Sequence, residues 1–383
     1  MVHERGPRSR ATITAETGLN RSTVADLVAE LAARGLVSEQ QPDRTHRVGR
    51  PSPIVSCRED VVAIGVNPEV DAVELAVVAL GGRVCARERV EVTMPGVGEV
   101  AEIVARVVRA WGRRKRAGSV VVGIGVAVPG LVRAEDGLIR LAPHLGWRDA
   151  DLAGPVEAAT GLPVAVGNDA SLGARAEHLF GAARDHDDIV YLNGGSSGIG
   201  GGLILHGRLI GGTGGYAGEW GQTAVALASV DVRRLDRVVL EDEVNRARLV
   251  EAAGLGAVDD AALAAALSRD VAEPAVAEID RQRRILAAAL GNAVTVLNPS
   301  KIVLGGFLAM LRDAAPERFD AAVRSGALAV SAERLEVASA ALGADRLLIG
   351  AADAAFARLL SDPGADAPSA DVAGYPSGGV MTE

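Results

Sequence analysis

The sequence predicts an α/β protein in which a small helix-turn-helix head precedes a body of two similar lobes. Aliphatic runs typical of buried strands alternate with a helical segment over residues 61–128. A second series of strand, glycine turn and strand begins near Ile189. Residues 1–50 instead hold two short helical segments around a glycine turn. At 383 residues, the chain has room for two or three domains.

The composition is that of a globular protein whose charge is unevenly distributed. Hydrophobic residues make up 49% of the chain and charged residues 23%. The net charge is −9, but residues 1–50 carry eight arginines against six acidic residues, which gives them +2 and leaves −11 for the rest. A mildly basic segment before an acidic body predicts that only the head contacts nucleic acid.

Cysteine usage and hydropathy predict a cytoplasmic protein. The two cysteines, Cys57 and Cys85, form no Cys-x-x-Cys pair, which argues against a disulfide framework and against a cysteine zinc site. The amino terminus lacks the charged and then apolar pattern of a secretion signal. The longest apolar run, residues 120–132, is interrupted by glycines and a proline and is too short to cross a bilayer, so we expect a buried strand there and no membrane partner.

The head has the pattern of a helix-turn-helix. Helical segments at residues 9–16 and 21–34 flank a turn in which Gly18 reverses the chain and Asn20 can cap the second helix. In units of this kind the start of the second helix enters the major groove of DNA. An apolar stripe on that helix is formed by Val24, Leu27, Val28 and Leu31. The predicted DNA contacts at its start are Arg21, Ser22 and Thr23.

A strand at residues 36–39 and a polar loop at 40–50 predict a wing beside this motif. The loop ends in Gly-Arg-Pro, which lets an extended arginine enter a narrow minor groove, so Arg47 and Arg50 are further predicted DNA contacts. An ordinary helical hairpin with a solvated face is the alternative. A winged helix-turn-helix also needs a first helix over the apolar stripe, and we expect the head, residues 1–55, to lack it because few residues precede the first helical segment.

The order of elements in residues 61–128 is that of the first lobe of an actin-like ATPase, a ribonuclease H-like fold. Strands are expected at residues 61–66, 73–80, 84–90 and 120–128, and a helix at 97–110. We expect the first lobe at residues 60–167, with 350–360 returning to it, and the second at 168–349. Two such lobes predict a ligand cleft between them. Residues 361–383 are rich in Ala, Pro, Gly, Ser and Asp, and we expect them to be disordered.

Glycine is concentrated in residues 193–222, which hold 13 of the 46 glycines. Glycine allows positive φ and close approach of the backbone to a ligand, and bare N–H groups suit an anion or a sugar. Aliphatic residues between the glycines predict a hairpin leading out of this loop. A flexible linker is the alternative, although linkers rarely contain such strand-forming runs. The segment ends in a carboxylate, Glu219, and an amide, Gln222, both next to glycines.

Five motifs follow one another along residues 10–360. They are Thr-Gly-Leu-Asn-Arg-Ser-Thr-Val at 17–24, Leu-Ala-Pro-His-Leu-Gly-Trp at 141–147, Gly-Asn-Asp-Ala at 167–170, Ala-Gly-Glu-Trp-Gly at 217–221 and Leu-Asn-Pro-Ser-Lys-Ile-Val-Leu-Gly-Gly at 297–306. Together they resemble the ROK family of sugar kinases and sugar-responsive repressors, and the first motif resembles its repressor branch. The resemblance implies the actin-like fold and a sugar ligand.

The resemblance also implies which residues bind the sugar. In kinases of the family the aspartate of the Asn-Asp pair accepts a proton from the hydroxyl that attacks ATP, and Asp169 stands at that position beside Asn168. The resemblance implies that Glu219 accepts a hydrogen bond from a second sugar hydroxyl. Gln222 can both donate a hydrogen bond to a hydroxyl and accept one from it. His144 lies where the family more often has asparagine. An Asn-Asp pair also occurs at ordinary helix starts, and Glu219 could be a plain turn carboxylate.

The first phosphate loop departs from the family pattern. The family sequence Asp-x-Gly-Gly-Thr corresponds here to Asn67 to Val70, where a proline removes an N–H donor and a glutamate adds negative charge. The second phosphate loop, with Gly195, Gly198 and Gly200, would then be vestigial. We therefore expect no catalytic residue, no kinase activity and no bound ATP.

The zinc site of the family is also altered. The family's histidine corresponds to Gln222, and the residues that correspond to its cysteine run, 224–239, contain no cysteine. Because zinc needs three or four such ligands, we expect no metal here. The family has a further sugar-binding glutamate after its cysteine run. Glu241 is the candidate for that position here, but no motif aligns it with the family's glutamate.

The sequence thus predicts a sugar-responsive transcriptional regulator without kinase activity, and specifically a repressor of carbohydrate-utilisation genes. Its expected partners are operator DNA and a sugar or sugar derivative, and operator symmetry predicts a homodimer or higher homo-oligomer. An active ROK sugar kinase with a vestigial head is the alternative, which the altered phosphate loop opposes. A third hypothesis is a structural relative that binds no ligand.

Overall fold

The computed structural model describes residues 1–41, 52–113, 119–195, 198–225, 238–256, 258, 260–267 and 273–364. The chain divides into two compact units. Unit 1 comprises Met1–Val128, Gly137–Gly167 and Leu347–Glu383, and unit 2 comprises Pro129–Asp136 and Asn168–Arg346. Among the described helices, none is both long enough and apolar enough to cross a membrane.

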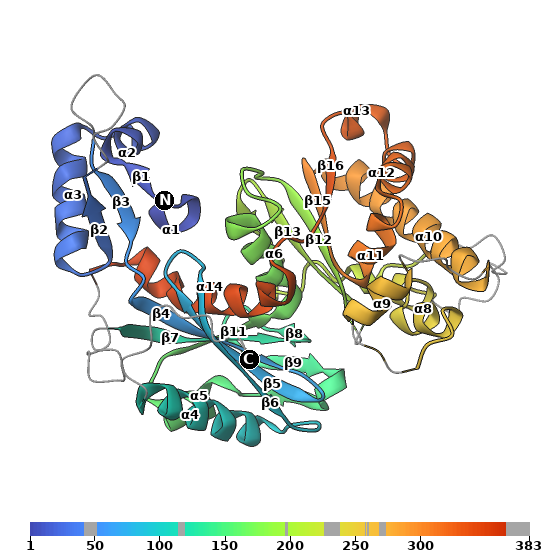
Figure 1. The fold of residues 1–383 in the computed structure, drawn as a ribbon, viewed down its shortest axis with the longest axis horizontal. Coiled ribbons are helices and arrows are strands. Elements are labelled where there is room, and N and C mark those ends of the chain that lie inside the picture. The colour runs from blue at the N-terminus through green and yellow to red at the C-terminus, as the bar shows by residue number, and fades with distance from the viewer. Residues whose placement is uncertain are drawn as a thin grey trace. The chain divides into compact units, whose positions relative to one another are not determined.

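The head combines short helices with a three-stranded sheet (Figure 1). Its elements are α1 (Val2–Arg5), β1 (Arg8–Ser9), α2 (Arg10–Thr17), α3 (Arg21–Ala33), β2 (Val37–Gln40) and β3 (Ile54–Cys57), with strand order β1-β3-β2. The two predicted helices are confirmed as α2 and α3. Gly18 ends α2 with a φ of 69°, and the Thr23 amide donates to Asn20 Oδ1 at 2.8 Å, which caps α3. The predicted wing contacts Arg47 and Arg50 lie outside the described residues.

A buried histidine fixes α1 to the rest of unit 1. The Gly81 amide donates to His3 Nδ1 at 2.9 Å, so the ring proton lies on Nε2, which donates to Asp353 Oδ1 at 2.9 Å. The His3 ring also packs edge-on against Phe356, with ring centroids 5.7 Å apart. His3 and Asp353 are both almost fully buried. The head is therefore attached to the last described helix, α14 (Arg346–Ser361).

The main sheet of unit 1 has five strands in the order β11-β7-β4-β5-β6. The strands are β4 (Val61–Pro68), β5 (Ala72–Ala79), β6 (Val84–Glu91), β7 (Val120–Val128) and β11 (Val164–Asn168). The predicted strands are confirmed, and β4 is buried along its whole length. Helices α4 (Val97–Arg113) and α5 (Ala153–Thr160) cover one face, and α14 covers the other (Figure 1). Burial on both faces explains why β4, β5 and β7 read as largely aliphatic runs. Smaller elements are β8 (Leu131–Val132) in unit 2, and β9 (Ile139–Ala142), the 3-10 turn η1 (Pro143–Leu145) and β10 (Trp147–Ala150) in unit 1.

Two glycines let α14 lie directly on this sheet. A β-carbon at Gly125 would lie 1.7 Å from the Ala351 carbonyl oxygen, and one at Gly65 would lie 2.0 Å from the Leu348 carbonyl oxygen. Neither contact has room for a side chain. Gly125 of β7 and Gly65, the single glycine of β4, are therefore required by helix packing.

Unit 2 is built on a second five-stranded sheet with the order β14-β13-β12-β15-β16. The strands are β12 (Ile189–Gly195), β13 (Gly198–Leu205), β14 (Arg208–Leu209), β15 (Lys301–Gly306) and β16 (Glu336–Ser339). As in unit 1, the first strand pairs antiparallel with the second and parallel with a later one, here β15. The predicted second series starting near Ile189 is confirmed, and the two sheets share one topology.

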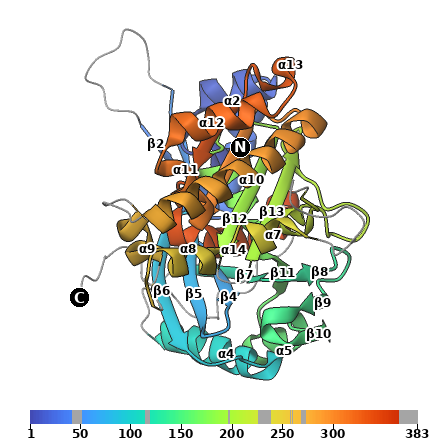
Figure 2. The same ribbon diagram turned by 90° about the vertical axis from the view of Figure 1, so that its right-hand side faces the viewer.

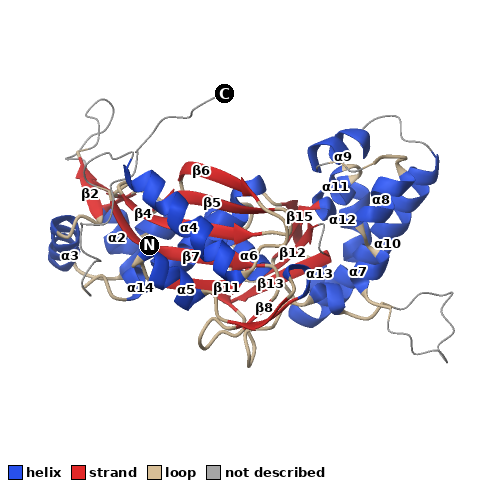
Figure 3. Ribbon diagram, turned by 90° about the horizontal axis from the view of Figure 1, so that it is seen from below, coloured by secondary structure: helices blue, strands red, loops and turns tan. Residues whose placement is uncertain are grey.

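The helices of unit 2 lie on both faces of its sheet (Figure 1), and the face that carries α10 is towards the viewer in Figure 2. They are α6 (Asp169–Phe180), α7 (Leu240–Glu243), α8 (Arg246–Ala252), α9 (Asp260–Leu267), α10 (Glu273–Leu297), α11 (Phe307–Asp313), α12 (Pro316–Ser325) and α13 (Ala329–Ala332), with the 3-10 turns η2 (Trp220–Gln222) and η3 (Gly343–Asp345). α6 lies on the side of β12 and β13 away from α8 and α10 (Figure 3). Leu286, Leu290 and Val294 of α10 pack with the buried strand residues in one core.

The carboxyl end of the chain departs from expectation at one point. Helix α14 continues through Ser361, the first residue of the segment that was expected to be disordered. Residues 365–383 lie outside the described residues.

Gly125→Ala tests the packing of α14 on the sheet. Because its β-carbon would overlap the Ala351 carbonyl oxygen, we expect a loss of about 3 kcal/mol or more in the free energy of unfolding. Gly98→Ala is the matched control: no atom lies within 4 Å of its β-carbon position at the start of α4, so stability should stay equal or rise by up to about 1 kcal/mol. Urea unfolding measures both, and equal stabilities for the two variants would contradict the packing.

Candidate functional site

The Asn-Asp pair lies at the junction of β11 and α6. Asn168 caps α6, because its Oδ1 accepts from the Ser171 amide at 2.8 Å. Its Nδ2 donates to the Gly130 carbonyl oxygen at 3.0 Å and to Asp169 Oδ1 at 3.1 Å. Asp169 Oδ1 also accepts from the Ala170 amide at 2.8 Å. The carboxylate of Asp169 therefore has a fixed orientation at a helix start, where backbone N–H groups favour negative charge.

Other elements pack closely against both faces of β13, the second strand of the glycine-rich hairpin. A β-carbon at Gly200 would lie 2.8 Å from the Ala170 Cβ, and one at Gly202 would lie 2.5 Å from the Ala174 Cβ, both on α6. A β-carbon at Gly201 would lie 2.1 Å from the Trp220 side chain on the opposite face. These glycines have an intramolecular packing role. Of the predicted vestigial phosphate loop, Gly195 pairs with Gly198 at the end of the hairpin, whose tip, residues 196–197, lies outside the described residues.

The turn that carries Glu219 and Gln222 is held by Glu241. The Gln222 side-chain amide donates to the Glu241 carboxylate, and the Ile199 amide donates to Glu241 Oε2 at 3.2 Å. Partial burial, and then the negative charge of Glu241, raise the pKa of Glu219, although Glu219 still reaches solvent. β-Carbons at Gly198 and Gly221 would each lie 2.6 Å from Glu241 Oε2. The sequence alone did not align Glu241 with a family residue. In the structure, Glu241 accepts a hydrogen bond from Gln222 of the predicted turn.

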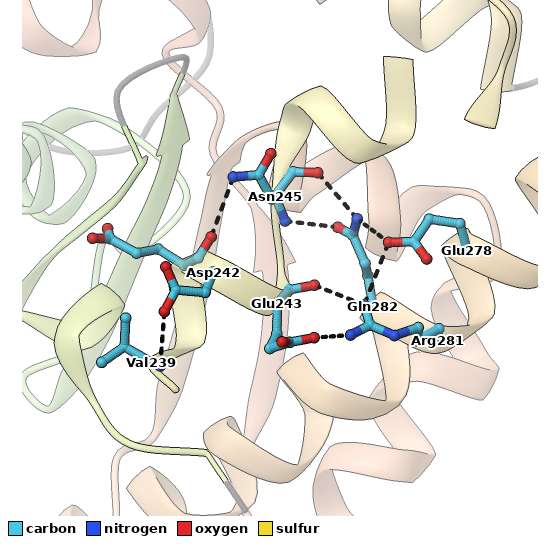
Figure 4. Close-up of polar contacts among 8 residues, drawn as sticks. Val239, Asp242, Glu243, Asn245, Glu278, Arg281 and Gln282 are labelled. Atoms are coloured by element: carbon cyan, nitrogen blue, oxygen red, sulfur yellow. Dashed lines mark hydrogen bonds and ion pairs between the residues drawn. The ribbon is translucent and has the colours of Figure 1, made fainter. Parts of the chain in front are cut away.

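A polar network on α10 positions the segment that carries Glu241 (Figure 4). Gln282, which is fully buried, accepts from the Asn245 amide at 3.1 Å and donates to the Asn245 carbonyl oxygen at 3.0 Å. Arg281 forms an ion pair with Glu243 and donates to its carbonyl oxygen at 3.0 Å. Asn245 Nδ2 in turn donates to the Glu241 carbonyl oxygen at 3.3 Å. This network was not predicted from the sequence. The feature that could have indicated it is Gln282, a polar residue on the otherwise aliphatic buried stripe of α10, because a buried polar side chain needs hydrogen-bond partners.

The remaining predicted sugar residue, His144, lies in η1 of unit 1, and its side chain is exposed. Asn168, Asp169, Glu219 and Gln222 all belong to unit 2. The predicted DNA contacts Arg21, Ser22 and Thr23 occupy the first turn of α3. Arg21 and Ser22 are exposed, and the Ser22 hydroxyl donates to Asn20 Oδ1 at 2.6 Å.

The altered phosphate loop forms a closed hairpin between β4 and β5. Asn67 Nδ2 donates to Glu69 Oε1 at 2.8 Å, and the Glu69 amide donates to the Ala72 carbonyl oxygen at 2.7 Å. Burial raises the pKa of Glu69, and the nearby carboxylates Glu74 and Asp71 raise it further. The Glu69 N–H of this turn is thus occupied by a backbone carbonyl oxygen, Pro68 has no N–H, and the Glu69 carboxyl group lies within the turn.

The described residues do not fit zinc. Among them, no group of three or more His, Cys, Asp or Glu side chains could hold a metal ion. Residues 223–239 contain neither histidine nor cysteine. Hydrogen bonds connect the two ends of this segment instead: Ala224 and Val239 form an antiparallel bridge, and the Leu240 amide donates to the Thr223 carbonyl oxygen at 2.9 Å.

Two units with one strand topology, and a carboxylate-bearing glycine turn in the second, define an actin-like fold of the sugar kinase type. Residues 63–238 match the model of the ROK family. The chain therefore contains a ROK family domain.

Similar proteins include both repressors and kinases. The chain is 28% identical to the xylose repressor of Caldicellulosiruptor bescii over 81% of this chain and 84% of that one. It is 29% identical to the xylose repressor of Bacillus subtilis over 58% of each chain, so this match spans less than two thirds of that relative.

Solved structures give the same picture of the fold. A ROK family transcriptional regulator described as a homologue of the E. coli MLC protein superimposes with a TM-score of 0.74 over 92% of this chain and 93% of that one, at 24% identity. A ROK family glucokinase from Streptomyces griseus, solved with glucose and AMPPNP, superimposes with a TM-score of 0.62 at 25% identity, over 76% of this chain and 98% of that one.

Glu241→Ala tests whether Glu241 holds the turn. Losing a carboxylate that accepts two hydrogen bonds should accelerate amide exchange at Ile199 and in residues 220–223 roughly 10- to 100-fold. Glu251→Ala, at an exposed position on α8, should leave these rates unchanged. Hydrogen–deuterium exchange measures both, and we expect no effect of a metal chelator on the unmutated chain. Faster exchange caused by the chelator alone would show that a metal, and not Glu241, holds the turn.

Proposed function

We propose that this chain is a sugar-responsive DNA-binding regulator, and specifically a repressor of carbohydrate-utilisation genes without kinase activity. The observation that carries the proposal is the polar turn of unit 2, in which Gln222 and Glu241 are tied together beside Glu219. Carboxylates and amides of this kind accept and donate the hydrogen bonds that sugar hydroxyls need. The similarity to xylose repressors and to a ROK transcriptional regulator supports a sugar effector and operator DNA as ligands.

In this proposal the sugar binds to unit 2, with Asp169 and Glu219 as hydroxyl acceptors. Asn168 orients Asp169 and is itself fixed by the Gly130 carbonyl oxygen. The chain passes from unit 1 to unit 2 between Gly167 and Asn168, so a sugar on Asp169 binds next to a connection between the units. A ligand that prefers one arrangement of the units would shift the population towards it, and the head, which is attached to unit 1 through His3, would respond.

A sugar kinase is the second candidate. It is supported by Asp169 at the position of the family's base and by the similarity to a glucokinase solved with glucose and AMPPNP. The hairpin at residues 67–70 opposes it, because it presents the partly buried carboxyl of Glu69 where a kinase needs phosphate-binding N–H groups.

Asp169→Asn and Arg21→Ala should separate sugar sensing from DNA binding. Asp169→Asn removes a charged hydroxyl acceptor worth about 1.5–3 kcal/mol, so the sugar concentration that releases operator DNA should rise roughly 10- to 100-fold while DNA affinity without sugar is unchanged. Arg21→Ala should weaken DNA binding and leave sugar binding unchanged.

A gel shift on the DNA upstream of the chain's own gene, titrated with a panel of sugars, measures release, and thermal shift measures sugar binding. If no sugar raises the melting temperature, the effector proposal fails. If Asp169→Asn releases DNA at the wild-type sugar concentration, Asp169 has no part in sensing.

A further inference from the structure

Helix α14 begins in unit 2 and continues in unit 1. Its first residue, Arg346, is the last residue of unit 2, and the boundary between the units falls before Leu347. From Leu348 on, its backbone packs directly on the glycines of β4 and β7 in unit 1. Because the chain crosses between the units at this point, a change in their arrangement acts on the amino end of α14.

The Arg346 side chain attaches this end of the helix to β12 of unit 2. Its Nη2 donates to Asn193 Oδ1 at 2.8 Å, and its Nη1 donates to the carbonyl oxygen of Gly343. Asn193 is buried, and so is the Nε atom of Arg346. A β-carbon at Gly305 would lie 2.7 Å from Asn193 Oδ1 and 3.6 Å from Arg346 Nε, so this glycine of β15 leaves the room in which the two side chains meet.

A second connection leads from the candidate sugar residue Asp169 to the same point. Asp169 is the first residue of α6, and Glu177, about 12 Å further along the helix at 1.5 Å per residue, is fully buried. The Glu177 carboxylate accepts from the amides of Ala341 at 3.0 Å and Leu342 at 2.9 Å. Leu342 is followed by η3 and then by Arg346. A displacement of α6 would therefore reach the segment that enters α14.

One buried hydroxyl group lies near both ends of this connection. Tyr191 of β12 is fully buried, and its burial raises its pKa. The charge of Arg346 lowers this pKa, whereas the charges of Glu177 and Asp169 raise it further. The candidate sugar acceptor and Arg346 thus lie within electrostatic reach of the same side chain.

The other half of α14 holds the head. Asp353, about 10 Å along the helix from Arg346, accepts a hydrogen bond from the buried ring of His3. Leu360, near the end of α14, and Val28, on the buried side of α3, line one apolar cavity of about 250 Å³. A movement of α14 would therefore reach the helix that carries the predicted DNA contacts.

We propose that Arg346 is a positioning residue that couples sugar binding in unit 2 to operator binding by the head. Its bond with Asn193 makes the amino end of α14 follow unit 2, and the other half of α14 carries the head. A sugar on Asp169 would displace α6, and Glu177 would pass this displacement to the entry of α14. The identity of the two ligands rests on the proposed function, whereas the contacts of Arg346 do not depend on it.

Arg346→Met tests the coupling, because methionine keeps an unbranched side chain but has no hydrogen-bond donor. The coupling is the factor by which a saturating sugar weakens operator binding, and by linkage operator DNA weakens sugar binding by the same factor. We expect this factor to fall roughly 10-fold, towards one, while the affinities for sugar alone and for operator alone change less than about threefold. Arg358→Met, at an exposed position on the same helix, is the matched control and should keep the wild-type factor.

Asn193→Leu removes the acceptor of the same bond and should lower the coupling factor to a similar extent. Because both substitutions act on one contact, the double variant should be no more defective than either single variant. A factor in Arg346→Met equal to that in Arg358→Met would overturn the proposal. So would a loss of sugar binding in Arg346→Met itself, because that result would place Arg346 in the sugar site.

Hydrogen–deuterium exchange without sugar or DNA tests the mechanical link independently. Arg346→Met should accelerate amide exchange in residues 341–352 roughly 10-fold relative to Arg358→Met, since the amino end of α14 would lose its attachment to β12. Equal rates in the two variants would overturn the link. If no sugar raises the melting temperature of the unmutated chain, the proposed function fails, and the exchange result still decides whether Arg346 fixes α14.

Discussion

Both sheets of this protein pack against neighbouring elements at distances that leave no space for a β-carbon. In unit 1, Gly65 and Gly125 bring β4 and β7 against the backbone of α14. In unit 2, the glycines of β13 let α6 approach one face while Trp220 covers the other. The candidate site depends on this constraint. α6 carries Asp169 and the Trp220 turn carries Glu219, so the glycines of β13 set how closely both can approach the same strand.

The same glycines show what could be predicted from the sequence. Strands β4, β5 and β7 of unit 1 and the start of the second sheet were predictable, because strands buried on both faces give largely aliphatic runs. The glycine stretch was predicted as a ligand loop, yet Gly200, Gly201 and Gly202 have intramolecular packing neighbours. A run of glycines identifies where the backbone must be closely approached. It does not show whether a ligand or another part of the same chain makes that approach.

Glu241 illustrates the limit for the site. Its contact with Gln222 depends on the bridge between Ala224 and Val239 and on the hydrogen bonds of Gln282, which lies far along the chain on α10. No local periodicity contains this information, because each link is a tertiary contact. By contrast, the Asn168–Asp169 pair was predictable, since a helix cap is a local feature with a clear residue signature. The candidate sugar residues thus comprise a locally encoded pair, Asn168 and Asp169, and a polar turn that is fixed only by folding.

The central claim is that the chain keeps a sugar-binding turn without the phosphate loop of a kinase. ADP formation, measured with Mg-ATP and each sugar that stabilises the protein, tests it most directly. We predict that no sugar raises the rate above that of the Asp169→Asn variant, because the hairpin at residues 67–70 carries a partly buried glutamate in place of phosphate-binding N–H groups. A sugar-dependent rate that Asp169→Asn abolishes would contradict the account and identify the chain as a kinase.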